Sequence, residues 1–247
     1  MKLGNPNNIE KSLIRTFWYY ADGLPIYKKV EGNYWDQAFA TNCAELLELS
    51  ADGYYAFDSG SIYYQSFYAA RCRAIHLLGA ARPAETSYLR DFSLTPESVA
   101  YLPAMVSVAP GCARFCRYVA ANEDGVPLSE FQTVHHAEVV PVDAYQSPLD
   151  LNYLTRPFLI VWTAGWKINL EIVGRGDFDG DGVDDVLLLI DVAAMAGRQT
   201  AANVFVLTRD RADAVLRVVD GDHDRWVLDT NLAVCAIFPC GTRDAHK

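Results

Sequence analysis

Apolar and polar residues alternate most regularly in the second half of the chain. Apolar side chains occupy every second position from Trp166 to Ile172, with polar side chains between them. A period of two predicts a half-buried β-strand. The apolar run 158–163 precedes it across Ala164-Gly165, which predicts a hairpin. Further apolar runs predict strands at 186–192, 204–208 and 215–219. We therefore expect an antiparallel meander in this part of the chain.

The first third carries apolar residues at helical spacing instead. One helix is expected to be capped by Asn8, a second to cover Trp35 to Leu47, and a third to begin after Asp58-Ser59-Gly60-Ser61. A further helix is expected to start at Thr95-Pro96-Glu97 and to end or kink at Pro103. The periodicity changes at about residue 111, which predicts a mainly helical region, 1–110, and an antiparallel β region, 111–247.

An acidic loop separates two of the expected strands. Counted from Asp177, carboxylates stand at loop positions 1, 3, 5 and 9: Asp177, Asp179, Asp181 and Asp185. Calcium prefers six to eight hard oxygen ligands, and this short segment supplies several of them. Gly182 permits a sharp turn at position 6, and the Val183 carbonyl stands at position 7. The predicted ligands are therefore these four aspartates and the Val183 carbonyl. Position 12 is Leu188, so the glutamate of a helix–loop–helix calcium site is missing.

This loop and the apolar strand after it resemble the calcium loops of FG-GAP and VCBS repeats. The resemblance covers roughly residues 170–220 and implies a calcium ion held between two strands of a blade-like sheet. Propellers of that family need several blades, because one repeat cannot bury its faces alone. A single copy is visible here. We therefore expect an α+β fold, in which a helical N-terminal part packs against a C-terminal antiparallel sheet carrying the calcium loop.

Six cysteines leave several arrangements open. Cys43 and Cys72 fall on apolar faces, where they are either core residues or one interhelical disulfide. Cys235 and Cys240 fit a small disulfide-closed loop, and together with Cys112 and Cys116 they could also form a zinc site. Disulfides are the favoured reading, ahead of free buried thiols and zinc.

Charge narrows the class of partner. The net charge is −10 without a compensating basic run, which argues against nucleic acid and anionic membranes. A cation or a basic protein fits better. No apolar run is long enough to span a membrane. The polar Gly/Asn/Pro start is typical of a trimmed mature chain, so a periplasmic or extracellular location is preferred to a cytoplasmic one.

Catalytic signatures are scarce in this sequence. It lacks G-x-S-x-G, H-E-x-x-H and a phosphate-binding glycine loop. His135 and His136 are adjacent and would point to opposite faces of a strand, so a surface or core role is favoured over metal binding there. Asp220, Asp222 and Asp224 repeat the early loop spacing without its glycine, and form either a second ion site or a solvated turn.

Three classes of function fit these observations. The favoured one is a non-enzymatic, calcium-stabilised exported bacterial binding protein, in particular an inhibitor or immunity protein against a secreted cell-wall-degrading toxin, with contacts on the segments 79–95, 121–131 and 193–202. The second is a calcium-dependent adhesin or carbohydrate-binding module, favoured if aromatic side chains are exposed in a shallow groove. The third is a hydrolase whose site is assembled from scattered residues.

Overall fold

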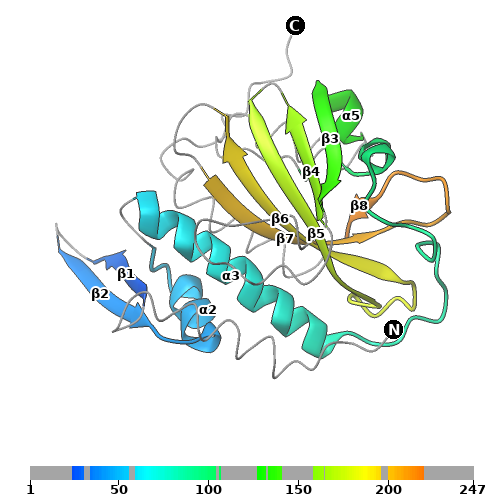
Figure 1. The fold of residues 1–247 in the computed structure, drawn as a ribbon. Helices are drawn as coiled ribbons and strands as arrows, with labels where there is room; N and C mark the ends of the chain where they lie inside the picture. Colours follow the sequence, from blue (N-terminus) through cyan, green and yellow to red (C-terminus); the bar gives the residue numbers. More distant parts are fainter. Residues whose placement is uncertain are drawn as a thin grey trace, which may run out of the picture.

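A meandering antiparallel sheet forms the centre of the molecule (Figure 1). The computed structural model describes residues 24–30, 34–55, 59–103, 106, 127–131, 133–140, 158–163, 165–195 and 200–219. In this part of the chain the sheet has six strands: β3 (Val134–Val140), β4 (Phe158–Thr163), β5 (Trp166–Gly176), β6 (Asp185–Ala194), β7 (Thr200–Thr208) and β8 (Arg217–Val218). Each strand pairs with its neighbour in sequence, which confirms the predicted meander.

The alternation of apolar and polar residues correctly predicts which face of β5 is buried. β4 and β5 form the expected hairpin, in which Leu159 pairs with Leu170 and Trp162 pairs with Lys167. Ile168 and Leu170 are fully buried in the core on one face of the sheet, whereas Lys167 lies on the other face and is half-buried. Burial of the apolar face therefore fixes the register of this hairpin.

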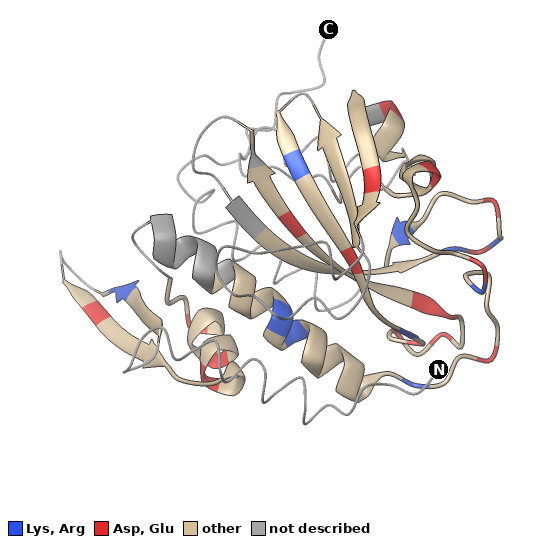
Figure 2. Cartoon of the chain, in the orientation of Figure 1, with Lys and Arg blue, Asp and Glu red and all other residues tan. Residues whose placement is uncertain are grey.

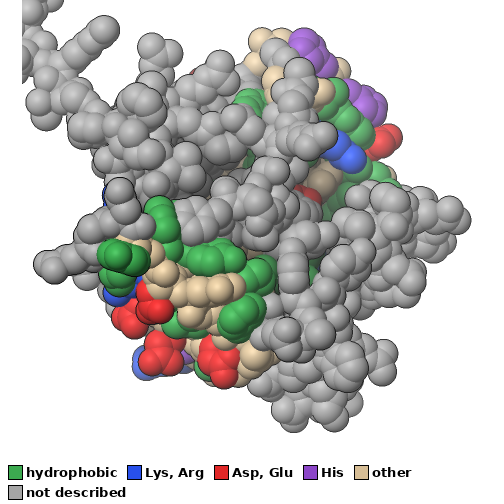
Figure 3. Space-filling model, turned by 90° about the vertical axis from the view of Figure 1, so that its left-hand side faces the viewer, with side chains coloured by type: hydrophobic (Ala, Val, Ile, Leu, Met, Phe, Trp, Pro, Cys, Tyr) green, Lys and Arg blue, Asp and Glu red, His purple; other side chains and the backbone are tan. Residues whose placement is uncertain are grey.

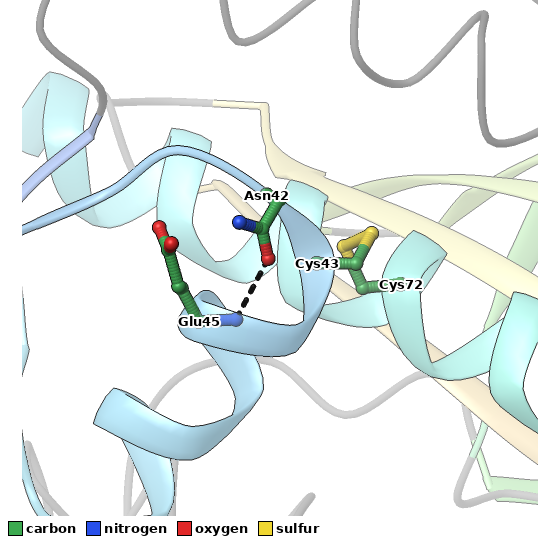
Figure 4. Close-up of a disulfide and its surroundings, with 4 residues drawn as sticks. All are labelled: Asn42, Cys43, Glu45 and Cys72. Carbon is green, nitrogen blue, oxygen red and sulfur yellow. Dashed lines mark hydrogen bonds between the residues drawn. A yellow bond between two sulfur atoms is a disulfide. The ribbon is translucent and has the colours of Figure 1, made fainter.

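The prediction of a helical N-terminal part is wrong. The described chain is mostly β and contains a second antiparallel sheet, formed by β1 (Leu24–Lys29) and β2 (Trp35–Ala40). The expected helix over Trp35 to Leu47 begins only at Cys43, as α2 (Cys43–Ala51), because Asn42 caps it and accepts a hydrogen bond from the Glu45 amide (Figure 4). Trp35 and Phe39 are four residues apart, a spacing that puts them on one face of a strand as well as of a helix.

The outcomes for the other predicted helices differ from one helix to the next. The helix after Asp58 is confirmed as α3 (Ser59–Ala80). The one expected at Thr95-Pro96-Glu97 is a short 3₁₀ helix, η1 (Pro96–Ala100), and Pro103 follows its end. A single helical turn, α5 (Leu128–Phe131), precedes β3. The helix expected after Asn8 lies outside the described residues. Within the described part, no helix combines the length and apolar character of a membrane span.

Hydrophobic cores lie on both faces of the six-stranded sheet. On one face, α3 crosses the sheet and packs with α2 and the β1–β2 hairpin (Figure 1). On the other face, residues of the segment 89–106 and of α5 pack against β4 to β8. Cys43 and Cys72 form a disulfide that joins α2 to α3 (Figure 4). The disulfide reading of these two cysteines is thus confirmed, and Cys112, Cys116, Cys235 and Cys240 lie outside the described residues.

Candidate metal centre

The acidic loop connects two central strands of the sheet. Gly176, the last residue of β5, pairs with Asp185, the first residue of β6, so the loop is closed at its base by a strand pair. Asp and Glu gather at this end of the sheet (Figure 2). The loop therefore projects from a rigid support, which limits the entropy lost when its carboxylates are held together.

Three of the predicted ligands converge on one point. Carboxylate oxygens of Asp177, Asp179 and Asp185 all lie within 4.8 Å of one another. Asp177 and Asp185 are buried, whereas Asp179 is exposed. Asp181 does not join this group: it is exposed at the loop tip, and its carboxylate accepts a 2.7 Å hydrogen bond from the Val183 amide. Val183 itself is half-buried.

Main-chain donors hold the carboxylates in place. The two Asp177 oxygens accept hydrogen bonds of 2.6 Å from the Gly180 amide and 3.1 Å from the Gly182 amide. One Asp185 oxygen accepts a 3.0 Å hydrogen bond from the Phe178 amide. Gly180 and Gly182 have φ angles of 86° and 82°, which L side chains rarely adopt. The glycines therefore let the chain wrap tightly around Asp177.

Among the loop aspartates, Asp185 has the most strongly shifted pKa. Burial is the main reason that the pKa of Asp185 is raised to about 6. The Phe178 amide and the Thr208 hydroxyl act to lower this pKa, and the charges of Asp179 and Asp181 act to raise it. The Oδ1 atom of Asp185 is buried and makes no hydrogen bond within the described part of the chain, although Thr208 lies beside it. Burial, followed by the neighbouring aspartates, also raises the pKa of Asp179.

These observations fit a divalent cation. A buried carboxylate oxygen without a donor is costly, and carboxylates crowded together disfavour the ionised form. A cation bound between Asp177, Asp179 and Asp185 would supply the opposite charge and remove both costs. All three donors are hard oxygens, which suit calcium or magnesium better than a soft metal. When bound, the ion would supply charge neutralisation and would hold the loop together.

A segment far away in sequence is fastened to the same loop. Main-chain atoms of Arg82 and Asp177 exchange two hydrogen bonds of 2.9 Å. The Gly182 carbonyl accepts hydrogen bonds from the Glu85 and Thr86 amides, and the Thr86 carbonyl accepts one from the Asp184 amide. We call residues 82–86 the clamp segment. It belongs to the stretch 79–95, one of the three segments expected to carry partner contacts.

Two polar contacts that the sequence did not reveal extend this support. Arg175 donates from its guanidinium to the carbonyl oxygens of Leu89 and Phe92. The Ser87 hydroxyl donates a 2.8 Å hydrogen bond to the Asp184 carboxylate. Both contacts join residues more than 80 positions apart. The one sequence signal was Arg175 itself, a cation at the end of an amphipathic strand, immediately before the acidic loop.

The remaining candidates stay apart from this centre. His136 and Glu138 lie two residues apart on β3, with 3.5 Å between His136 Nε2 and a Glu138 carboxylate oxygen, and both side chains are well exposed. His136 also packs against the Trp162 ring. This is the surface role that the sequence favoured. Asp220, Asp222 and Asp224 lie outside the described residues.

Comparison of the chain with protein-family models, with curated proteins and with solved structures gave no match. The likeness of the acidic loop to FG-GAP and VCBS repeats therefore remains a prediction based on the loop residues.

Proposed function

We propose that this chain is a calcium-stabilised, exported binding protein without a catalytic role. More narrowly, it acts as an inhibitor or immunity protein against a secreted, basic, cell-wall-degrading toxin. Calcium is held by Asp177, Asp179, Asp181, Asp185 and the Val183 carbonyl. Its role is structural, because the loop that carries the three converging carboxylates also anchors the clamp segment through main-chain hydrogen bonds of Asp177, Gly182 and Asp184.

One observation carries the choice of a protein partner. The β1–β2 hairpin exposes large aromatic side chains: Tyr34 is 77% exposed, Trp35 42% and Phe39 45%. Carboxylates of Asp36, Glu48 and Asp52 are exposed on β2 and at α2. On the face that carries these elements, hydrophobic side chains lie beside acidic ones (Figure 3).

Aromatic anchors surrounded by charge are typical of protein interfaces. The acidic surroundings would steer a basic partner towards this face, as would the net charge of −10. The Cys43–Cys72 disulfide supports an exported location, because disulfides persist in oxidising compartments.

The test uses the secreted hydrolase encoded next to this protein, if one is present. The purified proteins are mixed at micromolar concentration in calcium, and both complex formation and lysis are measured. We expect a complex that suppresses lysis and forms more slowly as salt increases. Phe39→Ser should weaken the complex. Val139→Ala, a change at another exposed apolar residue (40% exposed) on β3, is the matched control and should have no effect.

A missing complex, or a complex that leaves lysis unchanged, would refute the inhibitor proposal. Lytic activity from this protein alone would refute the non-enzymatic proposal.

A second candidate function, a glycan-binding module, is favoured by a separate observation. Tyr88 and Tyr101 are each nearly 40% exposed, and both line an open cavity beside the clamp segment.

A further inference from the structure

An open cavity of about 590 Å³ lies next to the clamp segment. Its walls come from the chain between Ser87 and Tyr101 and from the turn that follows β7. Its volume falls in the range of small-molecule sites. None of the residues expected from the sequence to bind calcium lines it.

The most unusual group in this cavity is the Arg209 guanidinium. Arg209 lines the cavity although only 7% of it is exposed. Its Nε donates a 2.8 Å hydrogen bond to the Tyr88 carbonyl, and its Cζ lies 5.7 Å from the centre of the Phe92 ring. Among the described residues, it forms no ion pair with a carboxylate. Burial lowers the pKa of Arg209, as expected for a cation taken out of water.

Asp91 and Asp213 act on Arg209 electrostatically but form no ion pair with it. A buried guanidinium without a direct ion pair is costly unless an anion binds to it. A second guanidinium, that of Arg175, lies behind the same turn on the Leu89 and Phe92 carbonyl oxygens. Both guanidinium groups donate hydrogen bonds to neutral carbonyl groups, which do not cancel the positive charge. An anionic group with planar, paired oxygens matches a guanidinium best.

The remainder of the lining limits the charge and type of the ligand. Asp91 and Glu97 line the cavity together with Arg90 and Arg209, so a multiply charged phosphate would be repelled by two carboxylates. Serine and threonine residues also line the cavity: Ser87, Ser93, Thr95 and Ser98. The Ser87 and Ser98 hydroxyls already donate to the Asp184 carboxylate and the Thr95 carbonyl. Ser93, Thr95 and the two carboxylates belong to residue types that can exchange hydrogen bonds with ligand hydroxyl groups.

The two tyrosines complete the pattern. Tyr88 is 38% exposed and Tyr101 is 39% exposed, and both line the cavity. An aromatic ring that is half open to solvent offers an apolar face together with a polar hydroxyl. That combination suits a ligand with both C–H faces and hydroxyl groups.

We propose that this cavity binds an acidic sugar, with a single carboxylate on Arg209 and the sugar ring beside Tyr88 and Tyr101. The inference rests on the general proposal that the chain is a binding protein, and it names a ligand class for a site separate from the aromatic hairpin. Inhibition of a hydrolase through the hairpin is a different measurement, so the two proposals succeed or fail separately.

The test is isothermal titration of the full chain, in calcium, with D-glucuronate, D-glucose and a short glutamate-rich peptide. We expect glucuronate to bind, and glucose to bind at least about tenfold more weakly because it lacks the charge-assisted hydrogen bonds. Tyr101→Ala should weaken glucuronate binding without unfolding the protein, since the ring is partly exposed.

The arginine is tested with a matched pair of variants. Arg209→Lys should lower glucuronate affinity by about tenfold or more, because lysine cannot make a bidentate contact. Arg211→Lys changes the exposed neighbour that pairs with Asp213, and it should leave affinity unchanged. Equal binding of glucose and glucuronate, no binding of either sugar, tighter binding of the peptide, or unchanged affinity in Tyr101→Ala would each overturn the proposal.

Discussion

Ser87 and Asp184 join the cavity to the acidic loop through a hydrogen bond of 2.8 Å between the serine hydroxyl and the carboxylate. Ser87 lines the cavity, and the Asp184 amide donates to the carbonyl of Thr86 in the clamp segment. The loop expected to hold calcium is therefore in direct contact with the turn that carries Tyr88. Order in the loop should be transmitted to this turn, because several hydrogen bonds would have to break before the two could separate.

Removal of calcium should lower the melting temperature of the protein. If the free calcium concentration is 100 times the dissociation constant, binding contributes about 2.7 kcal/mol. For a chain of this size, that corresponds to roughly 5–10 °C. Differential scanning calorimetry with calcium or with a chelator measures this shift, and Mg²⁺ at the same concentration should restore less of it. Identical melting curves in calcium and chelator would contradict the structural role.

Asp185 should make the metal-free protein less stable as the pH rises from about 4 to 6. The pKa of Asp185 is raised from 3.8 to about 6 in the folded state. In this window the folded protein therefore keeps a proton that the unfolded chain has released, and the free energy of unfolding falls as pH rises.

Asp185→Asn should remove this pH dependence and should stabilise the metal-free protein at pH 7 by about 2 kcal/mol. The same variant should no longer respond to calcium, because it lacks the buried carboxylate. Urea unfolding at several pH values checks both statements. A variant that keeps the pH slope of the parent protein would show that another group is responsible.

Gly182→Ala should damage the loop through the backbone alone. Gly182 has φ of 82°, a conformation that costs an alanine roughly 1–2 kcal/mol. We expect a comparable loss of stability and weaker calcium binding. Gly165→Ala is the matched control, since a Cβ there meets nothing within 4 Å and no unusual φ is required. Equal effects of both variants in thermal melts would argue against a special role of position 182.

The Cys43–Cys72 disulfide should stabilise the packing of α2 on α3. It closes a loop of 29 residues, for which loop-closure entropy predicts a contribution of about 3.5 kcal/mol. A double variant, Cys43→Ser with Cys72→Ser, should lose that amount in chemical unfolding. Mass spectrometry of alkylated, non-reduced protein checks the pairing itself. Labelling of Cys43 and Cys72 without a reductant would contradict the disulfide.

The elements that depend on local pattern could be predicted from the sequence, and those that depend on distant contacts could not. Strict alternation identified β5, because only a strand places every second residue on one face. Trp35 and Phe39 misled the helix prediction, since their spacing fits both periods. The hairpin of β1 and β2 depends on burial of Leu24 and Ile26 against α3 and the large sheet, which their immediate neighbours do not specify.

The candidate site divides in the same way. Asp177, Asp179 and Asp185 are close in sequence, and their convergence follows from the spacing of one loop. Arg209 and Tyr88 are 121 residues apart, and their contact depends on how β7 and the clamp segment meet. No local sequence pattern predicts the contact between Arg209 and Tyr88, so the cavity could not be predicted from the sequence.

The most direct test of the calcium proposal is a crystal structure of the protein grown in millimolar calcium. We expect one ion in the loop, with oxygen atoms of Asp177, Asp179, Asp181, Asp185 and the Val183 carbonyl at about 2.3–2.6 Å. Asp181 would then have to turn inward from the exposed position that it occupies now. A well-ordered loop without an ion at that calcium concentration would contradict the account.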